Sequence, residues 1–122
     1  MSTRLLLLAA LTLHLSAADL TGIWTGQLPD AGQDISFRFA QTGANVTGKF
    51  YTDNESIPLK NIKIEGDRIT FTVTVELNGQ FNIFTYTGVV RESEIEFTRT
   101  RESGRKEDKP FPKQTLVLRR LT

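Results

Sequence analysis

Ile69-Thr-Phe-Thr-Val-Thr-Val-Glu-Leu77 alternates apolar and polar side chains over nine consecutive positions. A strand places alternate residues on opposite faces, whereas a helix would scatter this pattern around its circumference. Asn78-Gly79 follows at once, and two-residue type I′ turns prefer this pair because both central residues need a positive φ. The stretch therefore predicts a strand, a tight turn and an antiparallel partner strand that begins at Gln80.

The same period of two continues on both sides of this hairpin and predicts eight strands. They cover residues 22–28, 34–41, 45–52, 59–65, 68–77, 80–91, 94–101 and 114–121. All connections are short except residues 102–113, and no stretch has a helical pattern. Because closure removes exposed sheet edges, we expect an all-β, eight-stranded antiparallel up-and-down barrel. A sandwich of seven or eight strands is the alternative.

Residues 1–18 predict a signal peptide. Arg4 gives a short positive segment, residues 5–15 are apolar, and Ser16-Ala17-Ala18 provides small residues for cleavage. A transmembrane helix needs roughly 20 apolar residues, about twice this run. We therefore expect a single mature domain over residues 19–122, a secreted or periplasmic location, and no membrane insertion after cleavage. A buried N-terminal helix is the alternative for this segment.

The composition of the chain narrows its chemistry. Without Arg4 the basic residues fall from 15 to 14 and equal the 14 acidic ones. The predicted mature chain is therefore neutral and has no excess positive charge with which to bind nucleic acid. The sequence has no cysteine, and its one histidine, His14, lies in the predicted leader. Zinc sites with His or Cys ligands and histidine-based triads are therefore excluded for the mature chain. We expect a protein that is not an enzyme and has no metal or cofactor.

Four carboxylates in predicted loops keep an enzymatic or calcium-binding alternative open. Asp30, Asp34, Asp53 and Glu55 could act as acid and base or bind Ca²⁺. Their spacing matches no known loop motif, and solvated carboxylates are the usual occupants of turns. The sequence therefore favours a binding role.

Tight turns fix which residues lie opposite each other and which share a face. Turns at 78–79, 92–93, 66–67 and 42–43 place the apolar residues of four hairpins on one common face. The predicted opposite pairs are Phe71 with Tyr86, Val73 with Phe84, Tyr86 with Arg99, Phe84 with Arg101, Lys60 with Val73, Phe39 with Val46, Phe37 with Gly48 and Ile35 with Phe50. This agreement between hairpins supports the barrel.

The inner face changes character along the barrel axis. One end collects apolar residues: Trp24, Phe39, Val46, Ile64, Ile69, Phe71, Val90, Ile95 and Phe97. The other end collects Lys60, Asn82, Tyr86, Arg99 and Arg101. Burying an unpaired cation costs several kcal/mol, more than the roughly 1.5–3 kcal/mol that a buried phenylalanine contributes. We therefore expect a dry closed end and a mouth open to water.

Gly22-Ile23-Trp24 at the start of the first strand resembles the opening of the calycins, which include lipocalins, fatty-acid-binding proteins and avidins. The resemblance implies that Trp24 plugs the closed end and that a basic residue of the last strand covers its indole. This residue is Arg120 if Leu116 points inward, and Arg119 otherwise. We expect no helix after the last strand and no helical lid, and Trp24 is the one tryptophan of the sequence. The sequence is therefore most similar to compact lipocalin-like barrels of small exported bacterial proteins.

We expect a non-catalytic binding protein that holds a small amphipathic or anionic molecule at the mouth. The predicted ligand-binding residues are Lys60, Asn82, Phe84, Tyr86, Arg99 and Arg101, with Phe37, Phe50 and Val75 as an apolar wall. The alternative is a barrel filled by its phenylalanines and Trp24, which would leave at most a shallow pocket at the rim.

A second functional prediction is a protein-binding module or a barrel similar to protease inhibitors. Residues 102–113 form a charged loop that carries Phe111 between two prolines. Phe81, Ile83 and Val89 add an apolar stripe to the predicted outer face of one strand, where a fully solvated strand would be polar.

Overall fold

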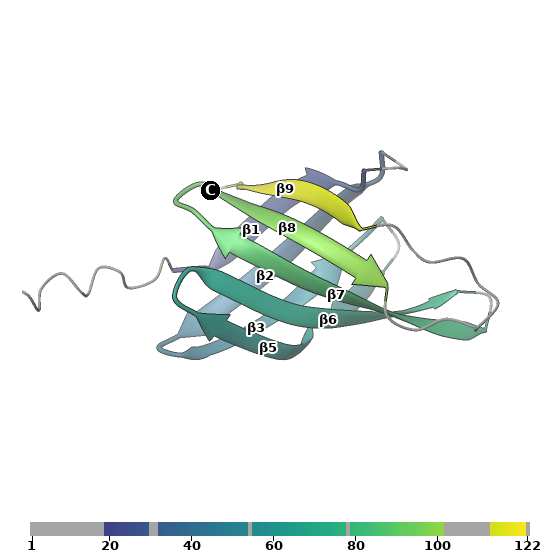
Figure 1. The fold of residues 1–122 in the computed structure, drawn as a ribbon, viewed down its shortest axis with the longest axis horizontal. Helices are drawn as coiled ribbons and strands as arrows, with labels where there is room; N and C mark the ends of the chain where they lie inside the picture. The colour runs from purple at the N-terminus through teal and green to yellow at the C-terminus, as the bar shows by residue number, and fades with distance from the viewer. Residues whose placement is uncertain (1–18, 30–31, 54, 78, 102–112, 122) are drawn as a thin grey trace, which may run out of the picture.

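The computed structural model describes residues 19–29, 32–53, 55–77, 79–101 and 113–121. All the elements in these ranges are strands: β1 (Gly22–Gln27), β2 (Asp34–Thr42), β3 (Asn45–Tyr51), β4 (Ser56–Pro58), β5 (Lys60–Glu65), β6 (Arg68–Leu77), β7 (Gln80–Val90), β8 (Glu94–Arg101) and β9 (Gln114–Arg120) (Figure 1). The predicted signal peptide and residues 102–112 of the predicted long loop lie outside the described ranges.

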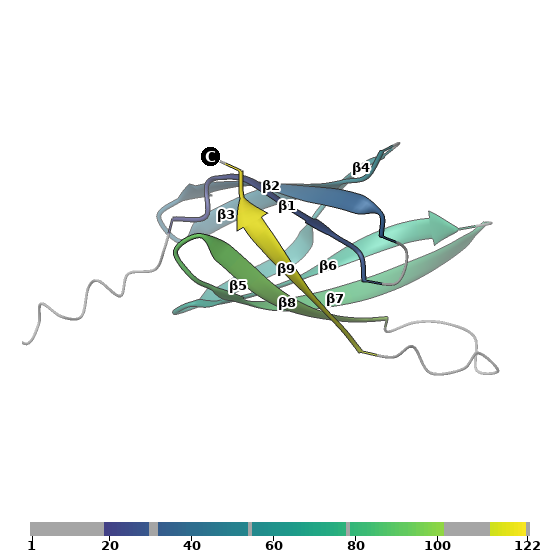
Figure 2. The same cartoon turned by 90° about the horizontal axis from the view of Figure 1, so that it is seen from above.

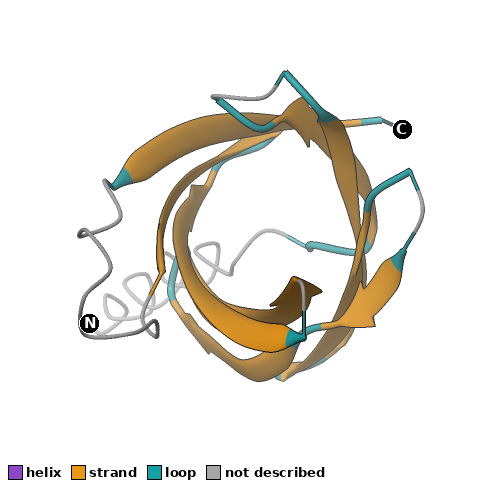
Figure 3. Ribbon diagram, turned by 90° about the vertical axis from the view of Figure 1, so that its right-hand side faces the viewer, coloured by secondary structure: helices purple, strands orange, loops and turns teal. Residues whose placement is uncertain are grey.

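The nine strands form a single antiparallel sheet in the order β4-β3-β2-β1-β9-β8-β7-β6-β5. The sheet curls into a nearly closed barrel, which Figure 3 shows along its axis. β9 lies between β1 and β8, so the last strand joins the two halves of the sheet (Figure 2). The prediction of an all-β barrel is confirmed, and the sandwich alternative is wrong because all the strands in the described ranges belong to one sheet.

Two predicted hairpins have the expected register. Phe71 lies opposite Tyr86 and Val73 opposite Phe84 across β6 and β7. Across β7 and β8, Tyr86 lies opposite Arg99 and Phe84 opposite Arg101. A two-residue turn leaves no freedom to slip, which explains why the sequence sufficed for these pairs.

The hairpin of β2 and β3 has a different register from the predicted one. Its turn is Gly43-Ala44, with φ of 62° at Gly43, so Thr42 lies opposite Asn45. Phe39 consequently lies opposite Gly48 rather than Val46. Phe37 lies opposite Phe50 and Ser36 opposite Tyr51, so the predicted pairs of Phe37 with Gly48 and Ile35 with Phe50 are also wrong. The shift is two residues, and an even shift keeps every side chain on its predicted face.

The segment from β4 to β5 departs most from the prediction. β4 is an unpredicted ninth strand that falls in an expected loop and pairs with β3. In β5, Lys60 lies opposite Thr72 and Lys63 opposite Thr70, so two residues, Asn61 and Ile62, face one residue of β6. This β-bulge, with φ of 57° at Asn61, moves Lys60 by one position.

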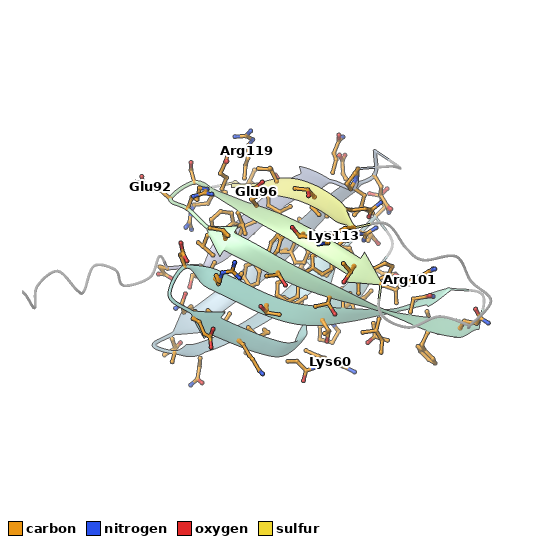
Figure 4. The ribbon with its side chains drawn as sticks, in the orientation of Figure 1. Lys60, Glu92, Glu96, Arg101, Lys113 and Arg119 are labelled. Atoms are coloured by element: carbon orange, nitrogen blue, oxygen red, sulfur yellow. The ribbon has the colours of Figure 1, made fainter. Side chains whose placement is uncertain are left out.

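A shift of one position transfers a side chain to the opposite face of a sheet. Lys60 therefore shares the outer face with Thr72, is exposed, and projects away from the barrel in Figure 4. The prediction that Lys60 lies opposite Val73 and points into the mouth is wrong for this reason.

Aromatic rings fill the closed part of the barrel. Phe71 packs at centroid distances of 5.2 Å from Tyr86, 5.4 Å from Phe97 and 5.5 Å from Phe37. Gly88 makes room for this cluster, because a Cβ there would lie 2.5 Å from Cε1 of Phe97. The interior is therefore a packed core at this level, as the filled-barrel alternative expected.

Trp24 belongs to the buried core and has no solvent exposure. Its Nε1 donates a hydrogen bond to the carbonyl of Leu20 at 3.0 Å. The guanidinium of Arg120 lies 4.3 Å from the centroid of the indole and donates to the carbonyls of Asp19 and Thr21. Arg120 is therefore the basic residue over Trp24.

Arg119 occupies the other face of β9. Its Nη1 lies 3.1 Å from the carboxylate of Glu94, and the side chain is 73% exposed.

The described part of the chain contains no helix long and apolar enough to span a bilayer.

Candidate ligand-binding site at the barrel mouth

A hollow of about 370 Å³ opens beside the β1–β2 and β3–β4 connections, which contribute Leu28, Gln33, Thr52 and Glu55 to its lining. Leu28, Phe50, Val75 and Phe84 form its apolar wall. Gln33, Thr52, Glu55 and Arg99 provide its polar groups. Small-molecule sites usually measure about 300–1,000 Å³ and combine an apolar wall with a few polar groups, so the volume and the lining fit a small ligand.

Arg99 is the buried cation of this site, with only 8% of its surface exposed. Its Nε donates to Oε1 of Gln114 at 2.7 Å, and its Nη1 donates to the hydroxyl of Tyr86 at 3.1 Å. The guanidinium carbon lies 4.6 Å from the ring centroid of Phe84. These contacts with neutral side chains and an aromatic ring fix the position of the guanidinium at the hollow.

Tyr86 forms the floor below Arg99. Its ring packs against Phe37, Phe71 and Phe97, at centroid distances between 5.2 and 5.7 Å. Burial raises the pKa of the Tyr86 hydroxyl, and the nearby Arg99 opposes this shift. The net direction is upward, so the hydroxyl stays neutral at physiological pH and can accept the hydrogen bond from Arg99.

The structure distributes the six predicted ligand-binding residues over several places. Phe84 and Arg99 line the hollow, while Tyr86 lies outside its lining and is hydrogen-bonded to Arg99. Asn82 is buried on the inner face opposite Val75, and Arg101 is half-buried at the end of β8 opposite Phe84 (Figure 4). Neither of these two lines the hollow. Lys60 lies on the outside, as described above.

Of the predicted apolar wall, Phe50 and Val75 line the hollow. Phe37 instead lies deeper, fully buried in the aromatic core. Five lining or supporting residues were not among the predicted ligand-binding residues: Leu28, Gln33, Thr52, Glu55 and Gln114. Gln114 had a usable signal, because it precedes the inward-facing Leu116 and Leu118 by an even number of positions on the same strand. The other four lie in or beside loops, where no alternating pattern indicates direction.

No family model, curated protein or solved structure significantly matches this chain. Among the described residues, no group of three or more His, Cys, Asp or Glu side chains could hold a metal ion. The arrangement of an apolar wall beside a fixed guanidinium suits the binding of a small molecule with an apolar body and a polar or anionic head.

Proposed function

We propose that this protein is a non-catalytic binding protein that holds a small amphipathic molecule with an anionic head group in the barrel mouth. The observation that carries the proposal is the hollow of about 370 Å³ with Arg99 at its base. The apolar body of the ligand contacts Leu28, Phe50, Val75 and Phe84. Its head group receives hydrogen bonds from the guanidinium of Arg99.

The site favours a small ligand with a single negative charge. Aromatic rings occupy the barrel below Tyr86, so a long acyl chain does not fit along the axis. Glu55 also lines the hollow, and its carboxylate repels a second negative charge on a ligand.

We also propose that the protein is exported and is lipocalin-like. It is supported by the leader pattern of residues 1–18 and by Gly22-Ile23-Trp24, whose tryptophan lies under Arg120. Detection of the protein in the extracellular or periplasmic fraction of its host, with Asp19 as its first residue, tests this part.

Isothermal titration with octanoate and 1-octanol tests the ligand class. These probes share an apolar chain and differ in the head group, so we expect octanoate to bind more tightly. Arg99→Gln should weaken octanoate binding by about tenfold or more, since a hydrogen bond to a charged group contributes about 1.5–3 kcal/mol. It should change 1-octanol binding little.

Arg91→Gln is the matched control, because Arg91 is exposed and pairs with Glu96 away from the mouth. It should leave the affinities for both probes unchanged. Equal affinity of the two probes for the unaltered protein, or equal losses in both arginine variants, would contradict a site built around Arg99.

Phe81 favours a second candidate function, the binding of a protein partner. Its side chain is 66% exposed on β7, whereas the other residues of the predicted stripe, Ile83 and Val89, are half-buried. Comparison of the proteins retained by the unaltered chain, by Phe81→Ser and by a deletion of residues 102–113 tests this alternative. Equal retention by all three would contradict it.

A further inference from the structure

A second hollow lies where the barrel is not fully closed. It measures about 680 Å³, and we call it the seam groove. Val46, Thr47 and Gly48 of β3 line one side, and Leu59, Asn61 and Ile62 line the other. It contains no residue of the mouth site, so it is a separate surface.

The seam groove exists because β4 and β5 pair with different neighbours. β4 pairs with Lys49–Tyr51 of β3, and the amide of Leu59 extends this pairing to the carbonyl of Gly48 at 2.9 Å. Beyond Leu59 the chain turns away, and β5 pairs with β6 instead. Among the described strands, Asn45–Thr47 pairs only with β2, and β5 pairs only with β6. Two strand edges therefore border the groove.

Unpaired edges offer backbone N–H and C=O groups to an added strand. The floor between them is apolar, with Val46, Leu59 and Ile62 all at least partly buried. These features suit an extended peptide segment whose backbone pairs with an edge and whose alternate side chains contact the floor.

The charges around the seam groove select the kind of segment. Arg38 lies directly opposite Lys49, both are exposed, and both line the groove. Their other directly opposite neighbours are Ile23 and Pro58, neither of which is acidic. Within the described ranges neither cation makes an ion pair. Like charges placed opposite each other destabilise a sheet, so this pair favours a ligand that brings negative charge.

We propose that the seam groove binds an extended acidic peptide segment of a partner protein by strand addition. Glutamate or aspartate side chains on one face of the segment pair with Arg38 and Lys49, while apolar side chains on the other face contact Leu59 and Ile62. A second copy of this chain is a poor occupant, because exposed Lys60 and Lys63 on β5 would meet the same positive surface.

Fluorescence anisotropy with a labelled eight-residue peptide of alternating valine and glutamate tests this proposal. We expect saturable binding to the full protein. Substituting lysine for every glutamate of the peptide should abolish binding. Methylation of alternate backbone nitrogens should also abolish it, because strand addition needs those donors.

Arg38→Glu and Lys49→Glu should each weaken binding of the alternating peptide by about fivefold or more, as expected when an exposed attraction of up to about 1 kcal/mol becomes a repulsion. Arg91→Glu, with the same change in net charge at a distant turn, should not. Equal losses of affinity for the peptide in all three variants would show that only the net charge of the protein matters. This result would overturn the proposal.

Polyglutamate separates strand addition from general attraction of anions. Strand addition would be overturned if polyglutamate bound with the same affinity as the alternating peptide. It would also be overturned if backbone methylation left the affinity of the alternating peptide unchanged. Either result would indicate a surface that attracts anions in general. Octanoate should not displace the peptide, since the mouth and the seam groove share no lining residue.

Discussion

The hydroxyl of Tyr86 accepts a 3.1 Å hydrogen bond from Arg99, and this contact joins the aromatic core to the polar mouth. Below the hydroxyl, the Tyr86 ring belongs to the packed core. Above it, the guanidinium lines the hollow that we propose as the ligand site. A single buried pair therefore sets the depth to which a ligand can enter.

The hydroxyl of Tyr86 should limit stability at alkaline pH. Burial raises its pKa in the folded protein, whereas the unfolded value is about 10. The contribution of the protonated hydroxyl to the free energy of unfolding is thus fully present below about pH 10. It is lost as the pH rises through the higher pKa of the folded protein. We expect Tyr86→Phe to remove this alkaline component of the unfolding free energy.

Absorbance at 295 nm provides the measurement, because it follows tyrosine ionisation directly. The folded protein should show an ionisation delayed relative to the unfolded chain. This phase should vanish in Tyr86→Phe and persist in the control Tyr51→Phe. Its loss in the control alone would show that the delayed group is not Tyr86.

Trp24→Ala should lower the free energy of unfolding by about 3–5 kcal/mol, as large-to-alanine changes in cores do. The indole is fully buried and also carries Arg120 on its face. Urea denaturation measures the loss. Phe81→Ala is the control, because this exposed ring should cost no more than about 0.5 kcal/mol. A loss below about 1 kcal/mol for Trp24→Ala would mean that the tryptophan does not close the core.

Gly88→Ala should destabilise the protein by about 1–3 kcal/mol through overpacking. The added Cβ would meet two atoms of the Phe97 ring at 2.5 and 2.6 Å and Cγ2 of Ile95 at 2.9 Å. Thermal unfolding provides the readout. The neighbouring Thr87→Ala, on the outer face, is the control and should have a much smaller effect. Similar losses for both variants would indicate a strand effect rather than a clash with Phe97.

Lys49→Glu should change stability and peptide binding in opposite directions. It replaces a like-charge pair with Arg38 by an opposite-charge pair, which should stabilise the folded chain by about 0.2–1 kcal/mol. The same substitution should weaken binding of the alternating valine-glutamate peptide. Urea denaturation at low salt measures the stability change, and addition of 1 M salt should reduce it. Destabilisation at low salt would contradict the like-charge account.

The sequence predicted those parts of the fold in which a tight turn fixes register. Asn78-Gly79 and the alternation that precedes it correctly placed Tyr86 opposite Phe71 and, through the next hairpin, opposite Arg99. Arg99 and Phe84 at the mouth followed from these pairings. Local chemistry determines such positions, because the turn allows only one alignment.

The sequence did not predict positions that depend on how the barrel closes. The β-bulge at Asn61 contains no glycine that would have indicated it in the sequence. This bulge places the side chain of Lys60 on the outer face. Likewise β4 has only three residues, which is too few to show an alternating pattern. It is defined by its pairing with the edge of β3. Glu55 reached the mouth for the same reason, since its place depends on the path between β3 and β4.

The pairing of β1 with β9 has a consequence for biogenesis. Trp24 of β1 lies opposite Arg120 of β9, so β1 gains its second neighbour only after every other strand of the sheet has been synthesised. Contacts between residues so distant in sequence slow folding. We therefore expect β1 and β8 to keep open edges until β9 joins them, so that closure of the barrel is a late step of folding.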